Sequence, residues 1–240
     1  MVLPRKLIFA WFVHLYTASG AVIAFLALLL IPQERFQAAF WLMLLAVLVD
    51  ASDGILARRA RVKELIPWFD GDRLEDIIDY LNYVLVLVFL LIWADLLPQN
   101  DALWLAALPL LASAYGFCQK QAKTSDHFFL GFPSYWNIVA FYLYVMQTPR
   151  WTNAFLIIIL SVMVFVPIRY LYPSRNPVWR NLTVGLGILW GGLVCITIYL
   201  LPRRSTFIVL ASLLFPIYYM ILSLWLEMRH QPTEKPTLQT

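Results

Sequence analysis

Residues 50–79 read DASDGILARRARVKELIPWFDGDRLEDIID and separate two long apolar runs of the chain. Asp50 and Asp53 close the first run, and Glu75 and Asp79 open the second. Ionisable groups beside hydrocarbon are energetically costly, so a cluster of them in an apolar chain indicates a functional site. The stretch therefore predicts two consecutive membrane helices with an acidic site where they meet.

The composition extends this prediction to the whole chain. Hydrophobic residues make up 62% of the 240 residues and charged residues 13%, whereas soluble domains are about half apolar and about a quarter charged. A helix needs roughly 20 apolar residues to cross the hydrocarbon layer. We expect an all-α integral membrane protein, a polytopic bundle of eight transmembrane helices at roughly 8–31, 35–57, 73–97, 102–119, 131–148, 152–171, 180–201 and 206–227.

The positive charges predict the orientation of these helices. Of the 18 lysines and arginines, 14 lie in the two terminal segments and in every second loop, and 4 lie on the other side. Positive residues favour the cytoplasmic side, so both termini and the acidic cluster should face the cytoplasm. We expect one domain over residues 1–228 and a polar cytoplasmic tail over 229–240. The net charge of +4 indicates no nucleic-acid partner, because no soluble basic face carries it.

The four acids have the spacing of a metal site. Asp50 and Asp53 are three residues apart on one predicted helix, and Glu75 and Asp79 are four apart on the next. Such pairs share a helix face, with Cβ atoms about 5–6 Å apart. Gathered carboxylates repel unless cations lie between them. Hard oxygen ligands suit Mg²⁺, Mn²⁺ or Ca²⁺, and the lack of neighbouring Cys or His argues against zinc. Two such ions would hold phosphate groups.

The neighbouring residues suit a phosphate ligand. Gly54 and Ala57 keep the first helix narrow beside the acids, and Arg58 can neutralise phosphate with its planar guanidinium group. Gly71 precedes the next helix, whose first N–H groups could also face an anion. Solvated loop charge is the alternative for any one acid, but the pattern D-x2-D-G-x2-A-R followed by G-x3-E-x3-D argues against it for the whole set.

This pattern resembles the signature of the CDP-alcohol phosphotransferase family, D-x2-D-G-x2-A-R-x8-G-x3-D-x3-D. The chain departs from it in two places. The spacer has twelve residues, since a spacer of eight would put Pro67 at the glycine position. Glu75 also replaces an aspartate, which leaves Asp76 or Asp72 as alternative ligands. The matching positions are Asp50, Asp53, Gly54, Ala57, Arg58, Gly71 and Asp79.

Other segments narrow the resemblance. The long spacer, GDRLEDIIDYLNYV (71–84), FFLGFPSYWNIVAFYLYV (128–145) and HLYTASG (14–20) are similar to the bacterial phosphatidylcholine synthase branch of that family. The resemblance covers most of the first 150 residues. It implies a reaction of CDP-diacylglycerol with choline that yields phosphatidylcholine and CMP, with two divalent cations, Mn²⁺ or Mg²⁺. It also implies a multi-pass protein of the bacterial inner membrane, in contact with membrane lipids, and a homodimer.

The resemblance also implies residue roles. Asp50, Asp53, Glu75 and Asp79 would hold both ions on the diphosphate, and Asp79 would also be the catalytic base for the choline hydroxyl. Thr17 would either touch the nucleotide or pack helices together. The CDP group would bind beside Gly54, Ala57, Arg58 and Gly71.

Choline carries no hydrogen-bonding group on its nitrogen, so aromatic faces should bind it. The alternative for any one aromatic ring is packing or anchoring at the membrane interface. The candidates near the cytoplasmic side are Tyr80, Tyr83, Tyr115, Tyr135 and Trp136.

Two other functions compete with this one. A sibling enzyme would use the same donor with serine, glycerol phosphate or inositol, but Lys and Arg are sparse outside the predicted loops, which favours choline. A transporter would use the acids to couple ions, but such acids more often lie near the bilayer midplane on broken helices.

Overall fold

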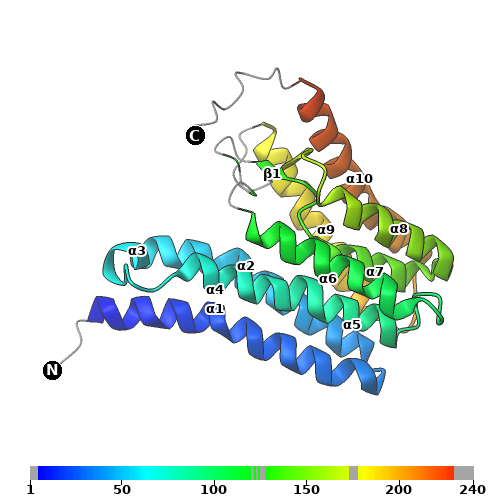
Figure 1. Cartoon of the computed structure of the whole chain (residues 1–240), viewed down its shortest axis with the longest axis horizontal. Coiled ribbons are helices and arrows are strands. Elements are labelled where there is room, and N and C mark those ends of the chain that lie inside the picture. Colours follow the sequence, from blue (N-terminus) through cyan, green and yellow to red (C-terminus); the bar gives the residue numbers. More distant parts are fainter. Residues whose placement is uncertain (1–4, 120–121, 123, 125–127, 173–177, 230–240) are drawn as a thin grey trace.

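The computed structural model describes residues 5–119, 122, 124, 128–172 and 178–229, and 79% of it is helical (Figure 1). The helices are α1 (Arg5–Leu30), α2 (Phe36–Ala60), α3 (Val62–Leu65), α4 (Gly71–Asp79), α5 (Val86–Trp93), α6 (Ala102–Cys118), α7 (Trp136–Met146), α8 (Arg150–Met163), α9 (Arg180–Leu200) and α10 (Thr206–Arg229). A 3₁₀ turn, η1 (Ile31–Gln33), follows α1, and a π-helical segment, η2 (Tyr80–Leu85), joins α4 to α5. The predicted tail over 229–240 lies outside the described residues except for Arg229.

Among the described residues, five helical segments are long and apolar enough to cross a membrane, which agrees with the prediction of an all-α membrane protein. They are Arg5–Gln33, Phe36–Ala60, Gly71–Trp93, Arg180–Leu200 and Thr206–Arg229. Large apolar side chains also point outward along the helices, as at Phe12, Leu111, Ile188 and Phe207. Such a surface is typical of contact with lipid rather than with water.

In the other three predicted spans, the helices of the structure are shorter than the roughly 20 residues that cross a bilayer. Helices α6, α7 and α8 have 17, 11 and 14 residues. The predicted span over 131–148 begins as a helix only at Trp136, beyond Pro133. The predicted span over 152–171 ends as a helix at Met163, because Pro167 has no N–H to donate to the next turn. Its last residues form a strand instead.

That strand belongs to a two-stranded antiparallel sheet, which the sequence did not predict. Strand β1 (Phe128–Leu130) pairs with β2 (Arg169–Leu171), with Phe129 opposite Tyr170. Gly131 ends β1 with a φ of +82°, and its N–H donates to the carbonyl of Ile168 at 2.9 Å. A Cβ atom at Gly131 would lie 2.3 Å from the carbonyl oxygen of Val164, so only glycine fits this turn.

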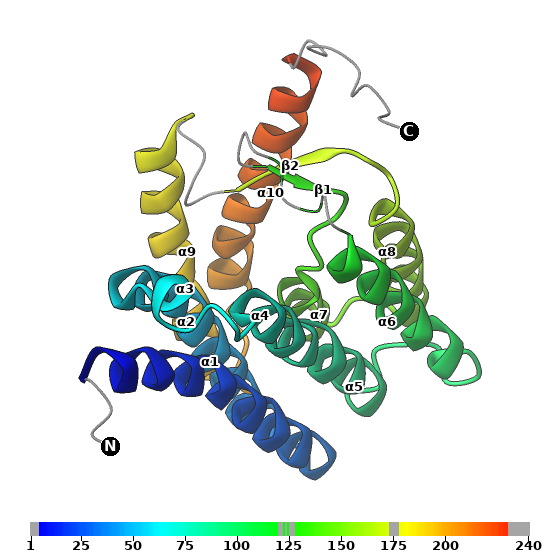
Figure 2. The same cartoon turned by 60° about the vertical axis from the view of Figure 1, so that its left-hand side comes forward.

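Helix α1 packs against both α2 and α4, the two helices that carry the acidic residues (Figures 1 and 2). A Cβ atom at Gly20 would lie 2.5 Å from Cγ2 of Ile78, so glycine lets α1 touch α4. Asn82 of η2 fastens this contact, because its Nδ2 donates to the carbonyls of Gly20 and Ile78, each at 3.0 Å. In Figure 2, the strand pair lies between α10 and the helices α6 and α8.

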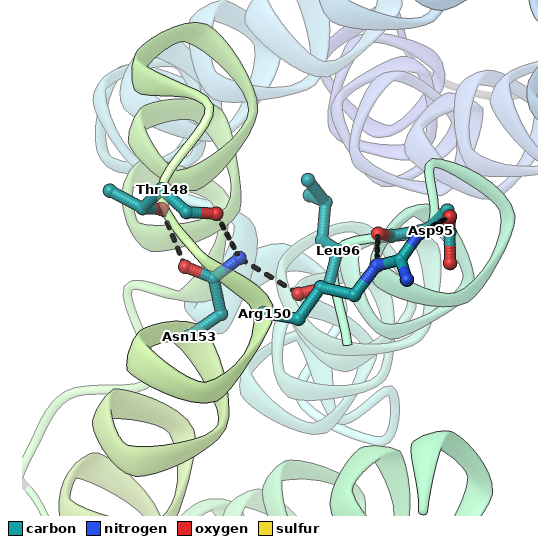
Figure 3. A network of polar contacts seen from close by, with 5 residues as sticks. All are labelled: Asp95, Leu96, Thr148, Arg150 and Asn153. Atoms are coloured by element: carbon teal, nitrogen blue, oxygen red, sulfur yellow. Dashed lines mark hydrogen bonds and ion pairs between the residues drawn. The ribbon is translucent and has the colours of Figure 1, made fainter. Parts of the chain in front are cut away.

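A polar network links the end of α5 to the start of α8 (Figure 3). The buried Asn153 donates to the carbonyl of Leu96 at 2.8 Å and to that of Thr148 at 3.3 Å. Its side-chain oxygen accepts from the Thr148 hydroxyl, and Arg150 forms an ion pair with Asp95. These bonds satisfy buried polar groups where two helices end, so they hold the loops rigidly at the end of the bundle away from the acids.

Candidate active site

Three of the predicted acids meet between two helices. One carboxylate oxygen each from Asp50 of α2 and from Glu75 and Asp79 of α4 lie within 4.8 Å of one another. All three residues are partly buried. We call Asp50, Glu75 and Asp79 the acidic triad. Its spacing is short enough for one cation to contact all three side chains.

The chain reversal between α2 and α4 brings the triad together. Helix α2 ends at Ala60, and Arg61 after it adopts the left-handed conformation with a φ of +53°. Helix α4 begins after Asp70, whose side chain accepts from the backbone N–H of Arg73 at 3.0 Å. Such capping stabilises a helix start by about 1 kcal/mol. Local signals therefore set both ends of the reversal that places α4 beside α2.

Asp53 lies beside the triad but outside the group of close oxygens. It is 5% exposed, and its Oδ2 accepts a hydrogen bond from the Thr17 hydroxyl at 2.8 Å. It lines one narrow pocket together with the triad and Thr17. The structure thus gathers all four predicted carboxylates in one place and gives Thr17 a partner, the Asp53 side chain.

Tyr83 orients a member of the triad. Its hydroxyl donates to Oδ2 of Asp50 at 2.9 Å. Tyr83 lies in η2, directly after α4, and π-helical turns of this kind occur frequently at functional sites.

Of the residues predicted to contact CDP, three lie on α2 and Gly71 lies at the start of α4. Arg58 is exposed, and its Nη1 lies 3.4 Å from where a Cβ of Gly54 would be, so both lie on the same face of α2. Ala57 packs against a small apolar cluster between α1, α2 and α3. Gly71 lies against α1, where a Cβ atom would be 2.8 Å from Cε1 of His14.

A cavity of about 560 Å³ opens beside the acidic triad. Two more acids, Asp72 and Asp76, lie on its wall with the triad, and Lys63 is the basic residue there. The Lys63 amine pairs with Oδ2 of Asp72 at 2.7 Å, and both side chains are exposed. Asp72 and Asp76, the alternative ligands for Glu75, therefore face the same cavity but lie outside the close group.

Aromatic residues form the other side of this cavity. Tyr83 and Tyr135, both predicted, lie on its wall, and so do Phe129 and Tyr172, which the sequence did not single out. Phe129 belongs to β1, and Tyr172 directly follows β2. No local pattern marks them, because only the pairing of the two strands brings them together.

The remaining three aromatic candidates lie elsewhere. The Tyr80 hydroxyl donates to the carbonyl of Leu110 at 3.0 Å. Tyr115 is 46% exposed and packs on Phe165, with ring centroids 4.7 Å apart. Trp136 is 1% exposed in the core. None of the three is among the residues that line the cavity in the described part of the chain.

Comparison with known proteins identifies relatives of this chain. No protein-family model matches the chain. The phosphatidylcholine synthase of Legionella pneumophila is 47% identical over 167 residues, which cover 69% of this chain and 66% of that protein. That of Legionella bozemanae is 47% identical over 65% of this chain and 72% of its own length. That of Pseudomonas aeruginosa is 37% identical over 75% of this chain and 76% of its own length. The chain therefore belongs to the phosphatidylcholine synthase family, a family of phosphatidyltransferase enzymes.

Proposed function

We propose that this chain transfers the phosphatidyl group from CDP-diacylglycerol to choline and releases CMP. The observation that carries this proposal is the acidic triad in the wall of a cavity of about 560 Å³. Membership of the phosphatidylcholine synthase family supports the choice of donor and acceptor.

The donor set suits two divalent cations. The triad offers hard oxygen ligands within 4.8 Å of one another, with no Cys or His in the group among the described residues. Asp53 in the adjoining pocket adds a fourth carboxylate. Asp50, Asp53, Glu75 and Asp79 would therefore hold two Mg²⁺ or Mn²⁺ ions. When bound, such ions supply charge neutralisation on the donor diphosphate.

The side chains of the site have separate tasks in this proposal. Asp79 accepts the proton of the choline hydroxyl while that oxygen bonds to the phosphorus that carries diacylglycerol. The bond from this phosphorus to the bridging oxygen breaks, and CMP leaves with the negative charge, which Arg58 helps to neutralise. Tyr83 and Thr17 orient Asp50 and Asp53 through the hydrogen bonds described above. Phosphoryl transfer depends mostly on such positioning and charge stabilisation.

The charge of the cavity supports a cationic acceptor. Five carboxylates and one lysine line its wall. Two divalent cations would balance this excess of negative charge. The bound donor diphosphate would then make the net charge of the cavity negative again. A positively charged alcohol such as choline is attracted to such a cavity, whereas glycerol phosphate would be repelled.

The proposal includes a location in the cell. The excess of Lys and Arg on one side supports cytoplasmic termini, so the acidic triad would face the cytoplasm from the bacterial inner membrane. The acyl chains of the donor would then stay in the bilayer while the diphosphate enters the polar cavity. A homodimer is the assembly that the family resemblance implies.

An acceptor panel tests the proposed function. The purified full chain in detergent would be given CDP-diacylglycerol, Mg²⁺ or Mn²⁺, and choline, serine, glycerol phosphate or inositol in turn. We expect CMP release that depends on choline and stays at background with the other alcohols. Turnover with serine alone would overturn the choice of acceptor, and no release with any alcohol would overturn phosphatidyl transfer.

The Thr17 hydroxyl donates to the carbonyl of Val13 at 3.4 Å as well as to Asp53, and it should matter for activity through Asp53. Replacing a group that orients a metal ligand typically lowers metal affinity or activity about 10- to 100-fold, so we expect Thr17→Val to lower CMP release by this factor. Thr17→Ser keeps the hydroxyl and should retain most activity. Thr197→Val is a matched control, since within the described part of the chain this buried threonine on α9 donates to the carbonyl of Leu193, at 2.8 Å, and to no carboxylate. Equal losses in Thr17→Val and Thr197→Val would contradict the orienting role.

A further inference from the structure

The strand pair places three aromatic rings at one corner of the acidic cavity. The rings of Phe129 and Tyr172 are stacked, with centroids 4.6 Å apart and an interplanar angle of 28°. Tyr135 stands nearly perpendicular to Phe129, at 6.3 Å and 83°. All three residues line the cavity. We call Phe129, Tyr135 and Tyr172 the aromatic corner.

Helix α10 holds this corner in place. The backbone N–H of Leu171 donates to the buried Ser223 hydroxyl at 3.1 Å, and the Leu171 carbonyl accepts from the Tyr219 hydroxyl at 2.9 Å. These bonds fasten β2 one residue before Tyr172. The ring of Tyr219 also contacts that of Tyr135, with centroids 6.0 Å apart. The corner is therefore fixed from two sides, which lowers the entropy lost when a ligand binds.

The surroundings of the corner suit a quaternary ammonium group. Such a cation donates no hydrogen bond, and proteins bind it with aromatic faces. Rings that serve only packing lie in apolar surroundings, whereas these rings share a cavity wall with five carboxylates. The carboxylates attract the cation, and the rings bind its methyl groups without competing for hydrogen bonds. The hydroxyl of the same small molecule could then reach the acidic triad.

We propose that the aromatic corner binds the trimethylammonium group of choline and that Phe129 and Tyr172 determine specificity for it. This inference rests on the proposed function and adds the part of the fold that selects the acceptor. It assigns the short sheet a purpose, because pairing β1 with β2 creates the stacked pair. Acceptor selection then depends on a segment that lies outside the signature of acids and glycines.

The test compares choline with its uncharged carbon isostere, 3,3-dimethylbutan-1-ol, at saturating CDP-diacylglycerol. A cation–π contact favours the cation by a factor of about 3 to 30. We therefore expect Phe129→Leu and Tyr172→Leu to lower the ratio of kcat/KM for choline to kcat/KM for the isostere by about this factor. Tyr172→Phe keeps the ring and should keep the ratio. A fluorinated phenylalanine at position 129 keeps the size of the ring but weakens its negative face, so it should lower the ratio without affecting folding.

Phe128→Leu is the matched control, because Phe128 neighbours Phe129 in β1 and packs against the same apolar cluster of Tyr170 and Tyr219, but is not among the described residues that line the cavity. It should leave the ratio unchanged. Equal losses with both acceptors in the Phe129 and Tyr172 variants would show a purely structural role and overturn the inference. If the wild-type enzyme uses choline and the Phe129 and Tyr172 variants leave the ratio unchanged, the inference is overturned and the proposed function stays intact. A wild-type chain without choline turnover would overturn the proposed function itself.

Discussion

Asp50→Asn and Asp53→Asn should each lower CMP release by roughly three orders of magnitude, since a lost metal ligand removes several kcal/mol of transition-state stabilisation and about 1.4 kcal/mol is tenfold. Asparagine keeps the shape of aspartate but loses its charge. At position 53 the amide oxygen can still accept the hydrogen bond from Thr17. We therefore expect both variants to fold and to insert into membranes. Initial rates of CMP release in detergent measure the effect.

Asp101→Asn is the matched control for these variants. Asp101 directly precedes α6 and lines an apolar groove between α6 and α8, and it is not among the described residues that line the acidic cavity. This variant should have wild-type activity. Size-exclusion profiles and thermal unfolding in detergent would show that all three variants fold. Retained activity in both Asp50→Asn and Asp53→Asn would contradict a metal site built from these carboxylates.

Removal of divalent cations should abolish CMP release. Without cations, the carboxylates of the triad repel one another within 4.8 Å, and Arg58 alone is left to stabilise the charge of the leaving CMP. Treatment with EDTA followed by buffer exchange should leave background activity, and Mg²⁺ or Mn²⁺ should restore it. Activity that survives exhaustive chelation would contradict the proposal.

Cation binding to the chelated protein can also be measured without catalysis, by thermal unfolding. A ligand at 100 times its Kd stabilises the folded state by about 2.7 kcal/mol. Adding Mg²⁺ or Mn²⁺ to the chelated protein should therefore raise its unfolding temperature. The rise should be smaller in Asp50→Asn and unchanged in Asp101→Asn. An equal rise in all three proteins would place the cation outside the triad.

Local signals in the sequence determined the acidic half of the site. The predicted spans 35–57 and 73–97 correspond closely to α2 (Phe36–Ala60) and to the continuous segment Gly71–Trp93. Apolar length sets these helices, and Asp70 caps the start of α4. The spacing of the acids along each helix then places them on facing sides, because helical periodicity is a local property.

Contacts between distant segments could not be predicted in this way. The bond from Thr17 to Asp53 depends on how α1 packs against α2, and the bond from Tyr83 to Asp50 depends on the η2 turn. Among the aromatic candidates, composition alone could not separate Tyr135, which lines the cavity, from Trp136, which lies in the core. Adjacent residues have different surroundings because the first helical turn of α7 points them in different directions.

The sequence by itself determined that this chain is a helical membrane protein with two pairs of carboxylates on consecutive helices, because hydrophobic length, helical spacing and capping depend on consecutive residues. Only the tertiary structure decided what faces the acids. Strands β1 and β2 have three residues each and lie about 40 positions apart, too short for a recognisable pattern. Their pairing, fastened by Ser223 and Tyr219 of α10, brings Phe129 and Tyr172 to the cavity.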